Sequence, residues 1–228
     1  MSFSGTRTVV IGGSSGIGYA TAERIVAAGG EVVVAARDDE RREEAAKTLG
    51  PNASEQPLDI TDRAEVKALF REGEVDYLVC TPAYIPTGFD ISEAELRQAF
   101  NVKFFGYYYA AEAAREVLPD DGAIVFLSGE ASVQPRPEYF AVGVVNAAVE
   151  CLTRYLAVEY APIRVSAVSP NLVDTFGMDE STRERAAESV PVGRVADPAD
   201  IADAVAFLLQ NRNTTGEVLR TNGGADLV

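Results

Sequence analysis

Histidine is absent from the 228-residue chain. Its absence excludes imidazole acid–base catalysis and removes the commonest metal ligand, so we expect no metal site. Proton chemistry must then use tyrosine, lysine, serine, cysteine or carboxylate side chains. Only two cysteines are present, Cys80 and Cys151, and their separation matches no metal-binding or redox motif. We predict that both are buried and reduced, as in cytosolic proteins.

Long hydrophobic runs, linkers and repeats are also missing. No apolar run approaches the ~20 residues that a membrane span requires, and residues 1–5 do not resemble a signal peptide. No Pro/Gly/Ser-rich linker divides the chain. With 47% hydrophobic and 24% charged residues, the composition predicts one compact domain over residues 1–228. We expect it to be cytoplasmic.

Basic residues are scarce, with 20 lysines and arginines against 35 acidic residues and a formal net charge of -15. An acidic surface repels nucleic acid and anionic membranes, so we expect neither as a partner. We interpret the acidity as a source of solubility. The expected partner is a small-molecule substrate.

A glycine-rich stretch, GGSSGIG, lies between a predicted buried strand at Thr8–Ile11 and a predicted helix at Tyr19–Gly29. At such a turn, backbone N–H groups and the helix dipole hold the pyrophosphate of a dinucleotide. Glycine lacks the Cβ that would block the phosphates. The predicted cofactor-binding residues of this turn are Gly12, Ser14, Ser15, Gly16, Ile17 and Gly18.

Apolar runs and helical patterns alternate along the rest of the chain. Further strands are predicted at Glu31–Ala36, Leu58–Asp59, Val75–Cys80, Gly122–Ser128, Ile163–Val168 and Glu217–Arg220. Helices are predicted at Asp38–Leu49, Glu93–Val117, Pro137–Tyr160 and Pro198–Leu209, and a short one within Asn171–Val190. A further helix is predicted to begin after its cap residue Thr61 and to run through Phe70. Ser92 and Glu95 form a capping box at the start of Glu93–Val117. Because the strands are continuous apolar runs, both faces of the sheet must be covered. The fold class is therefore α/β, a single-domain Rossmann-like doubly wound parallel sheet with helices on both faces.

Several motifs follow one another in an order typical of one family. They are GGSSGIG at Gly12–Gly18, LDITD at Leu58–Asp62, FNVKFFG at Phe100–Gly106, IRVSAVSPN at Ile163–Asn171, VGRVADPADIADAVAFLL at Val192–Leu209 and TGEVLRTNGG at Thr215–Gly224. Over essentially its full length the chain resembles the short-chain dehydrogenases/reductases. The resemblance implies a nicotinamide-dependent oxidoreductase that acts on a carbonyl or alcohol. It also implies a homodimer or homotetramer, with Tyr107, Tyr108 and Tyr109 in the interface and core.

The end of the second predicted strand bears on cofactor identity. NAD-dependent enzymes of this sheet type carry a carboxylate there, whereas this chain has Ala36 and then Arg37. A guanidinium suits the 2′-phosphate of NADP, so NADP(H) is the predicted cofactor. Asp38 leaves NAD open, since its carboxylate is close enough in sequence to bind ribose hydroxyls. The resemblance adds contacts to the adenine and to the nicotinamide carboxamide, at Asp59, Ile60, Val173 and Thr175.

The usual catalytic residues of the family are not in their usual places. Members commonly carry an Asn, a Ser, a Tyr and a Lys, the last two within a YxxxKAAV helix motif. In register, the Tyr position is Val142 and the Lys position is Asn146, while the Ser position falls on Gly129 and the Asn position on Lys103. The chain is thus predicted to be an atypical member that lacks the usual Ser/Tyr/Lys set.

The Asn and Lys positions are exchanged rather than simply lost. We hypothesise that Lys103, beside Asn146, binds the ribose hydroxyls and lowers the pKa of a nearby acid. Candidate proton donors are Tyr139, Glu130, Ser128 and Tyr84. An apolar substrate pocket is predicted around Phe176 and Met178, with Phe89 and Tyr84. Two alternatives stay open: a dinucleotide-binding regulatory or partner subunit without redox activity, and a non-redox isomerase or dehydratase.

Overall fold

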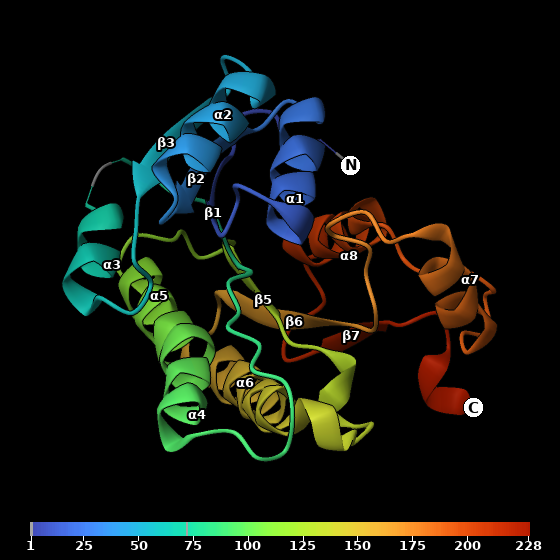
Figure 1. Cartoon of the computed structure of the whole chain (residues 1–228). Coiled ribbons are helices and arrows are strands. Elements are labelled where there is room, and N and C mark those ends of the chain that lie inside the picture. Colours follow the sequence, from blue (N-terminus) through green and yellow to red (C-terminus); the bar gives the residue numbers. More distant parts are fainter. Residues whose placement is uncertain (1, 72) are drawn as a thin grey trace.

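A seven-stranded parallel sheet forms the centre of the molecule (Figure 1). The computed structural model describes residues 2–71 and 73–228; Met1, the first residue of the stretch considered above for a signal peptide, lies outside them, as does Glu72. The strand order is β3-β2-β1-β4-β5-β6-β7. The strands are β1 (Arg7–Ile11), β2 (Glu31–Ala36), β3 (Ala53–Pro57), β4 (Tyr77–Cys80), β5 (Ala123–Leu127), β6 (Arg164–Pro170) and β7 (Val218–Thr221). The predicted doubly wound fold is confirmed.

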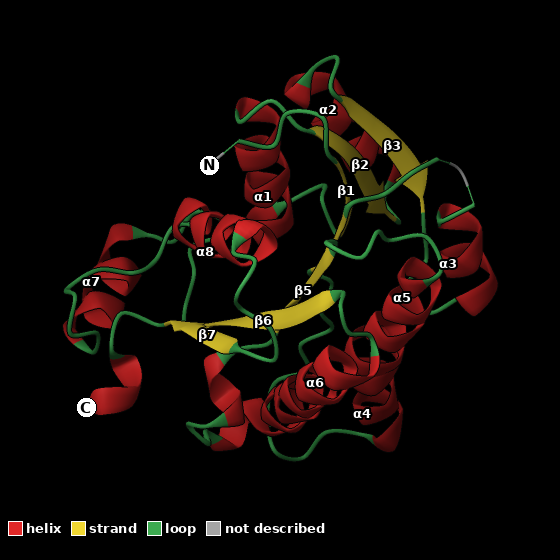
Figure 2. Cartoon of the chain, turned by 180° about the vertical axis from the view of Figure 1, so that it is seen from behind, coloured by secondary structure: helices red, strands yellow, loops and turns green. Residues whose placement is uncertain are grey.

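Helices cover both faces of this sheet (Figure 2). One layer consists of α1 (Gly16–Ala27), α2 (Asp39–Leu49) and α8 (Pro198–Gln210); the other consists of α3 (Arg63–Leu69), α4 (Glu93–Ala99), α5 (Gly106–Arg115) and α6 (Phe140–Glu159). Helix α7 (Glu180–Glu188) stands outside both layers. Successive residues of β5 alternate between two cores: Phe126 packs toward α5 and α6, and Val125 packs toward α1 and α8. This explains the uninterrupted apolar strands, because each face needs its own apolar side chains.

The order of the strands reverses at β1, which pairs with β2 on one side and with β4 on the other. At the end of these strands Ile11 is level with Cys80 of β4. Crossovers run to opposite faces from such a switch point and leave a crevice at the carboxyl ends. The glycine-rich turn that follows Ile11 enters this crevice.

The long predicted helix Glu93–Val117 is interrupted by a π-helical segment. Helix α4 begins at the predicted capping box, where Ser92 Oγ accepts from the Glu95 N–H at 3.2 Å and the Glu95 carboxylate accepts from the Ser92 N–H at 2.9 Å. The segment η1 (Phe100–Phe105) then has π-helical geometry before α5 continues to Arg115. Such wider turns are common at functional sites, and this one contains Lys103.

Two local predictions near the third strand were wrong. The strand is Ala53–Pro57, and Leu58 and Asp59 follow it. It forms an edge of the sheet and is half-exposed, so it has polar residues instead of the apolar run that marks the central strands. The cap of α3 is Asp62 rather than Thr61, because the Asp62 carboxylate accepts from the N–H of Ala64 at 2.8 Å.

Helix α6 combines a buried and an exposed apolar side. The stretch Pro137–Glu159 is long and apolar enough, with a mean hydropathy of 1.4, to cross a membrane by length and composition alone. Its Val149 and Leu156 are nevertheless part of the core under the sheet, as in core helices generally. Cys151 lies on the outer side and is exposed, which contradicts the prediction that both cysteines are buried; Cys80 is buried.

Candidate active site

One cleft of about 1130 Å³ lies at the carboxyl ends of the strands. All the residues predicted above for cofactor binding line it, and so do all those predicted for catalysis except the donor candidate Tyr84. On the cofactor side these are Gly12, Ser14, Ser15, Gly16, Ile17, Gly18, Arg37, Asp59, Ile60, Val173 and Thr175. On the reaction side they are Lys103, Ser128, Glu130, Tyr139 and Asn146. The fold therefore brings together residues that are more than 100 positions apart in the sequence.

The glycine turn is a cradle without room for side chains. Gly12 has φ +81, and a Cβ there would lie 2.4 Å from Thr81 Oγ1. A Cβ on Gly18 would lie 2.1 Å from the carbonyl oxygen of Gly12, so this glycine lets α1 approach β1 closely. Helix α1 begins at Gly16, earlier than the predicted Tyr19, and its cap residue Ser15 makes no side-chain capping bond. A helix N-terminus in such a cradle suits the pyrophosphate of a dinucleotide.

Two arginines line the adenosine end of the cleft. Arg37 was predicted there, and Arg41 joins it from the first turn of α2. The sequence analysis missed Arg41, although its spacing of four residues from Arg37 on a helix start was a usable signal. The Asp38 carboxylate caps α2 by accepting from the Arg41 N–H at 3.0 Å. The Asp38 carboxylate, which had kept NAD open as the alternative cofactor, is thus engaged in capping the helix.

Asp59 is held rigidly at the same end of the cleft. Its Oδ1 accepts from the Thr61 N–H at 2.9 Å and from the Thr61 hydroxyl at 2.8 Å. Burial alone raises the pKa of Asp59, but the Thr61 hydrogen bonds and the positive charge of Arg37 outweigh this effect, and the net pKa lies below its ordinary value. Asp59 is therefore a fixed anionic acceptor for a donor group such as an exocyclic amine.

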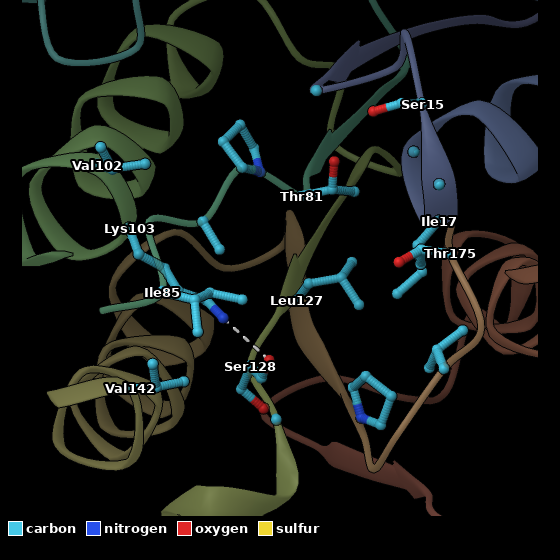
Figure 3. A pocket seen from close by; sticks show the side chains of 18 of the residues that line it. Ser15, Ile17, Thr81, Ile85, Val102, Lys103, Leu127, Ser128, Val142 and Thr175 are labelled. Carbon is cyan, nitrogen blue, oxygen red and sulfur yellow. Dashed lines mark hydrogen bonds between the residues drawn. The ribbon is translucent and has the colours of Figure 1, made fainter. Parts of the chain in front are cut away.

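Lys103 and Asn146, the two residues predicted to be exchanged relative to the family register, meet on the reaction side. Lys103 Nζ donates to Asn146 Oδ1 at 2.7 Å and to the Ser128 carbonyl oxygen at 3.0 Å. Figure 3 shows Lys103 and Val142 on one wall of the cleft, with Ser15, Ile17 and Thr175 on the opposite wall. Burial lowers the pKa of Lys103 to about 7, although the negative charge of Glu150 acts in the opposite direction. The amine thus titrates near neutrality.

Gly129 fits this pair by having no side chain. Asn146 Nδ2 donates to the Gly129 carbonyl oxygen at 3.2 Å, and a Cβ on Gly129 would lie 2.8 Å from that nitrogen. The backbone of Gly129 is extended, with φ 164, so its conformation does not require glycine. Glycine is required because the Asn146 amide approaches so closely.

Glu150, a residue missed in the sequence analysis, lies behind this wall. Its Oε1 accepts from the hydroxyls of Ser128 at 3.1 Å and of Ser132 at 2.5 Å. Glu150 is buried and follows Asn146 by one turn of α6. An acidic residue inside the apolar stretch of a core helix was the available signal, since buried carboxylates are rare without a specific partner.

The two leading proton-donor candidates differ in their surroundings. Glu130 Oε2 accepts from Asn222 Nδ2 at 2.8 Å, while its Oε1 is buried without a hydrogen-bond partner among residues 2–71 and 73–228. Burial raises the pKa of Glu130. Tyr139 was predicted to lie inside the long helix Pro137–Tyr160. It instead ends the short helix η3 (Pro137–Tyr139), just before α6 begins. Its hydroxyl makes no hydrogen bond within the described part of the chain, and the ring lines the cleft beside Val142.

The predicted apolar pocket is only partly assembled. Phe176 and Met178 line the cleft together with Ile85 and Leu172. Phe89 instead packs against Phe140, with ring centroids 5.1 Å apart, and is not among the lining residues. Tyr84, the fourth donor candidate, is 40% exposed and also lies off the lining. The sequence alone could not rank these residues, because loops carry no periodic pattern.

Comparison with known proteins agrees with this geometry. Residues 11–226 match a family model described as enoyl-(acyl carrier protein) reductase. A short-chain dehydrogenase/reductase from Stachybotrys chlorohalonatus is 32% identical, with 98% of each chain covered. A short-chain dehydrogenase/reductase from Brucella melitensis, named as a glucose/ribitol dehydrogenase, superimposes with a TM-score of 0.93 at 27% identity, covering 99% of both chains.

A second solved structure is a small-chain dehydrogenase in complex with NADPH. It has a TM-score of 0.84 and 34% identity, and the match covers 98% of this chain and 99% of that one. The family model and these relatives span nearly the whole of the chain, and the fold agrees with the solved structures. The chain belongs to the short-chain dehydrogenase/reductase family.

Proposed function

We propose that the protein is an NADP(H)-dependent oxidoreductase that interconverts a carbonyl compound and an alcohol with a rearranged catalytic set. Family membership supports oxidoreductase activity in general. The observation that carries the finer proposal is the 2.7 Å hydrogen bond between Lys103 and Asn146. It joins the two positions at which the family register exchanges lysine and asparagine.

The adenosine end of the cleft supports NADP(H) over NAD(H). The guanidinium groups of Arg37 and Arg41 line it, and a 2′-phosphate would pair with such groups through charge-assisted hydrogen bonds. The free hydroxyl of Ser15 would add a donor to the phosphates. The neighbouring structure that was solved with NADPH is consistent with this choice.

When bound, a nicotinamide cofactor would supply the hydride for reduction of the carbonyl carbon. Lys103 would hold the ribose hydroxyls through its ammonium group, which Asn146 and the Ser128 carbonyl orient. Tyr139 donates its phenolic proton to the carbonyl oxygen and is reprotonated from solvent. Lys103⁺ favours ionisation of the phenol during this step.

The other donor candidates have competing partners. The Ser128 hydroxyl donates to Glu150 rather than into the cleft, and Glu130 is tied to Asn222. Tyr139 is therefore the preferred donor, and Glu130 is the second choice because burial raises the pKa of its carboxyl group.

The outer side of α6 supports the expected homodimer or homotetramer. Tyr155 and Val158 are 74% and 81% exposed, and Val144 and Phe105 extend this apolar area to η1. We propose that a second copy covers it, and sedimentation of Val158→Asp against the parent protein would test this. The free cysteines agree with a cytoplasmic enzyme.

The proposal is tested by NADPH oxidation against a panel of aldehydes and ketones. Tyr139→Phe should lower kcat by about 100-fold or more while leaving the NADPH Kd unchanged, since only the proton donor is removed. Tyr155→Phe removes an exposed hydroxyl of the same kind and serves as the control. NADPH binding without redox turnover on any substrate would instead favour the regulatory or non-redox alternatives. Retained activity in Tyr139→Phe would transfer the donor role to Glu130.

A further inference from the structure

A buried carboxylate lies directly behind the reaction side of the cleft. Glu150 is only 4% exposed and leaves α6 on the same side as Asn146, four residues earlier. The hydroxyls of Ser128 and Ser132 both donate to its Oε1. A buried carboxylate is costly unless hydrogen bonds and a nearby positive charge compensate for the lost water. The two serines supply hydrogen bonds, and the charge must come from another residue.

Lys103 is the nearby cation. Ser128 bridges the two charged groups, because its carbonyl oxygen accepts from Lys103 Nζ at 3.0 Å and its hydroxyl donates to Glu150 at 3.1 Å. Asn146, which accepts from Lys103 at 2.7 Å, lies on the same helix one turn before Glu150. The ammonium and the carboxylate are therefore connected through Ser128 inside the protein, where charges are weakly screened.

We propose that Glu150 is a positioning residue of this site: its carboxylate favours the ammonium form of Lys103 and fixes the wall from Ser128 to Ser132 against α6. Its importance for turnover rests on the function proposed above. The charge relation itself exists in the protein without cofactor. Lys103, Asn146 and Glu150 then act as one unit, in which Glu150 stabilises the positive charge that Lys103 presents to the cleft.

No other ionisable group of the described residues acts on Lys103 in this way. Burial raises the pKa values of Tyr107 on α5 and Cys80 on β4 well above their ordinary range, so both stay neutral. Glu130 on η2 (Glu130–Ser132) has a raised pKa, caused first by burial, and its carboxylate is bound by Asn222. Tyr139 lines the same cleft from η3. Glu150 therefore provides the charge that opposes the effect of burial on Lys103.

The test measures the titration of Lys103 directly. The chain has only three lysines, Lys47, Lys67 and Lys103, so the side-chain signals of a protein labelled with ¹³C-lysine are readily assigned by comparison with Lys103→Met. We expect the wild-type Lys103 signal to titrate at a pH of about 7. In Glu150→Gln the midpoint should fall by about one pH unit, because a neutral amide no longer favours the ammonium.

Matched variants separate charge from packing. Ser132→Ala removes a hydrogen bond to Glu150 but keeps the charge, so its midpoint should equal that of the wild type. Glu150→Asp keeps the charge but withdraws it by one methylene, so it should lower the midpoint by a smaller amount. This variant also provides the test if Glu150→Gln does not fold. An unchanged midpoint in the folded Glu150 variants, or an equal shift in Ser132→Ala, would overturn the inference.

A second measurement links the inference to the cofactor. The Kd of NADPH, followed by fluorescence from acidic to alkaline pH, should rise as Lys103 loses its proton, and this rise should begin at lower pH in Glu150→Gln. If the lysine midpoint shifts as expected but NADPH does not bind, the proposed function fails and the role of Glu150 stands. If NADPH binds with the same pH dependence in both proteins while the lysine midpoint is unmoved, the proposed function stands and the role of Glu150 fails.

Discussion

The two sides of the cleft are built in different ways. The cofactor side is formed mainly by one continuous backbone segment, Gly12–Gly18, whose contacts depend on the absence of side chains. The reaction side is formed by side chains from η1, β5 and α6 that meet through Lys103, Ser128 and Asn146. A backbone cradle tolerates few changes, because a Cβ at Gly12 or Gly18 collides with its neighbours. A side-chain cluster can be rebuilt by compensating exchanges, and this contrast is compatible with the reorganised reaction side that we propose.

A substitution at Gly18 should have the largest effect on the cofactor side, on both stability and NADPH binding. In Gly18→Ala the new Cβ would meet the Gly12 carbonyl at 2.1 Å, so α1 and β1 must separate. We expect a loss of about 3 kcal/mol in the free energy of unfolding and of at least about 100-fold in NADPH affinity. Denaturation and fluorescence titration measure the two effects. Gly5→Ala is the control: Gly5 also has a positive φ, +76, but open space around it, so NADPH affinity should be retained. Equal NADPH binding by both variants would argue against the cradle.

The reaction side should tolerate a double exchange better than either single one. Lys103→Asn removes the cation, and Asn146→Lys places two ammonium groups together, so each should lower kcat/KM by about 100-fold. The double variant restores one cation and one amide and should recover at least about tenfold over the worse single variant. Steady-state kinetics of the four proteins give the coupling. Additive losses would mean that the two residues do not act as a pair.

Arg37 and Arg41 lie at the edge of the cofactor side, where we expect side chains rather than backbone to select NADPH over NADH. Arg37→Ala and Arg41→Ala should each weaken NADPH binding by about tenfold and leave NADH binding unchanged, because only NADPH carries the 2′-phosphate. Competitive titration of both cofactors measures this. Arg97→Ala, which removes an exposed arginine paired with Glu93, is the control. A parallel loss for NADH would assign the arginines a structural role.

The last expected effect is a pH dependence of stability caused by Lys103, which is gradual because it is spread over several pH units. Its pKa is about 7 in the folded protein, against 10.5 for an ordinary lysine. Between these values the unfolded chain binds more protons, so the free energy of unfolding should rise with pH above about 7, by at most about 1.4 kcal/mol per pH unit. Below pH 7 both states are protonated and the slope disappears. Subtracting the urea-unfolding profile of Lys103→Met, measured from pH 6 to 9, isolates this contribution. Parallel profiles for the two proteins would show that Lys103 titrates normally.

The two sides also differ in how far they were predictable. Local patterns of glycine, charge and hydrophobicity predicted the order of strands and helices. They also predicted that the turn Gly12–Gly18 and Arg37 lie at the carboxyl ends of the strands, where both line the cleft. The contact of Lys103 with Asn146 was anticipated through the family register, and the structure brings the two residues together. Local errors arose where tertiary context decides the outcome, as at the polar edge strand β3 and at the exposed Cys151.

The doubly wound sheet and the glycine turn could be predicted from the amino-acid sequence by itself, since local patterns of apolar, polar and glycine residues indicate both. Only the tertiary structure decided that Glu150 lies behind Lys103 and that Gly129 makes room for the Asn146 amide. These features depend on which side chains become neighbours after distant elements pack. The strength of a buried charge, moreover, depends on burial and on partners that no sequence window contains.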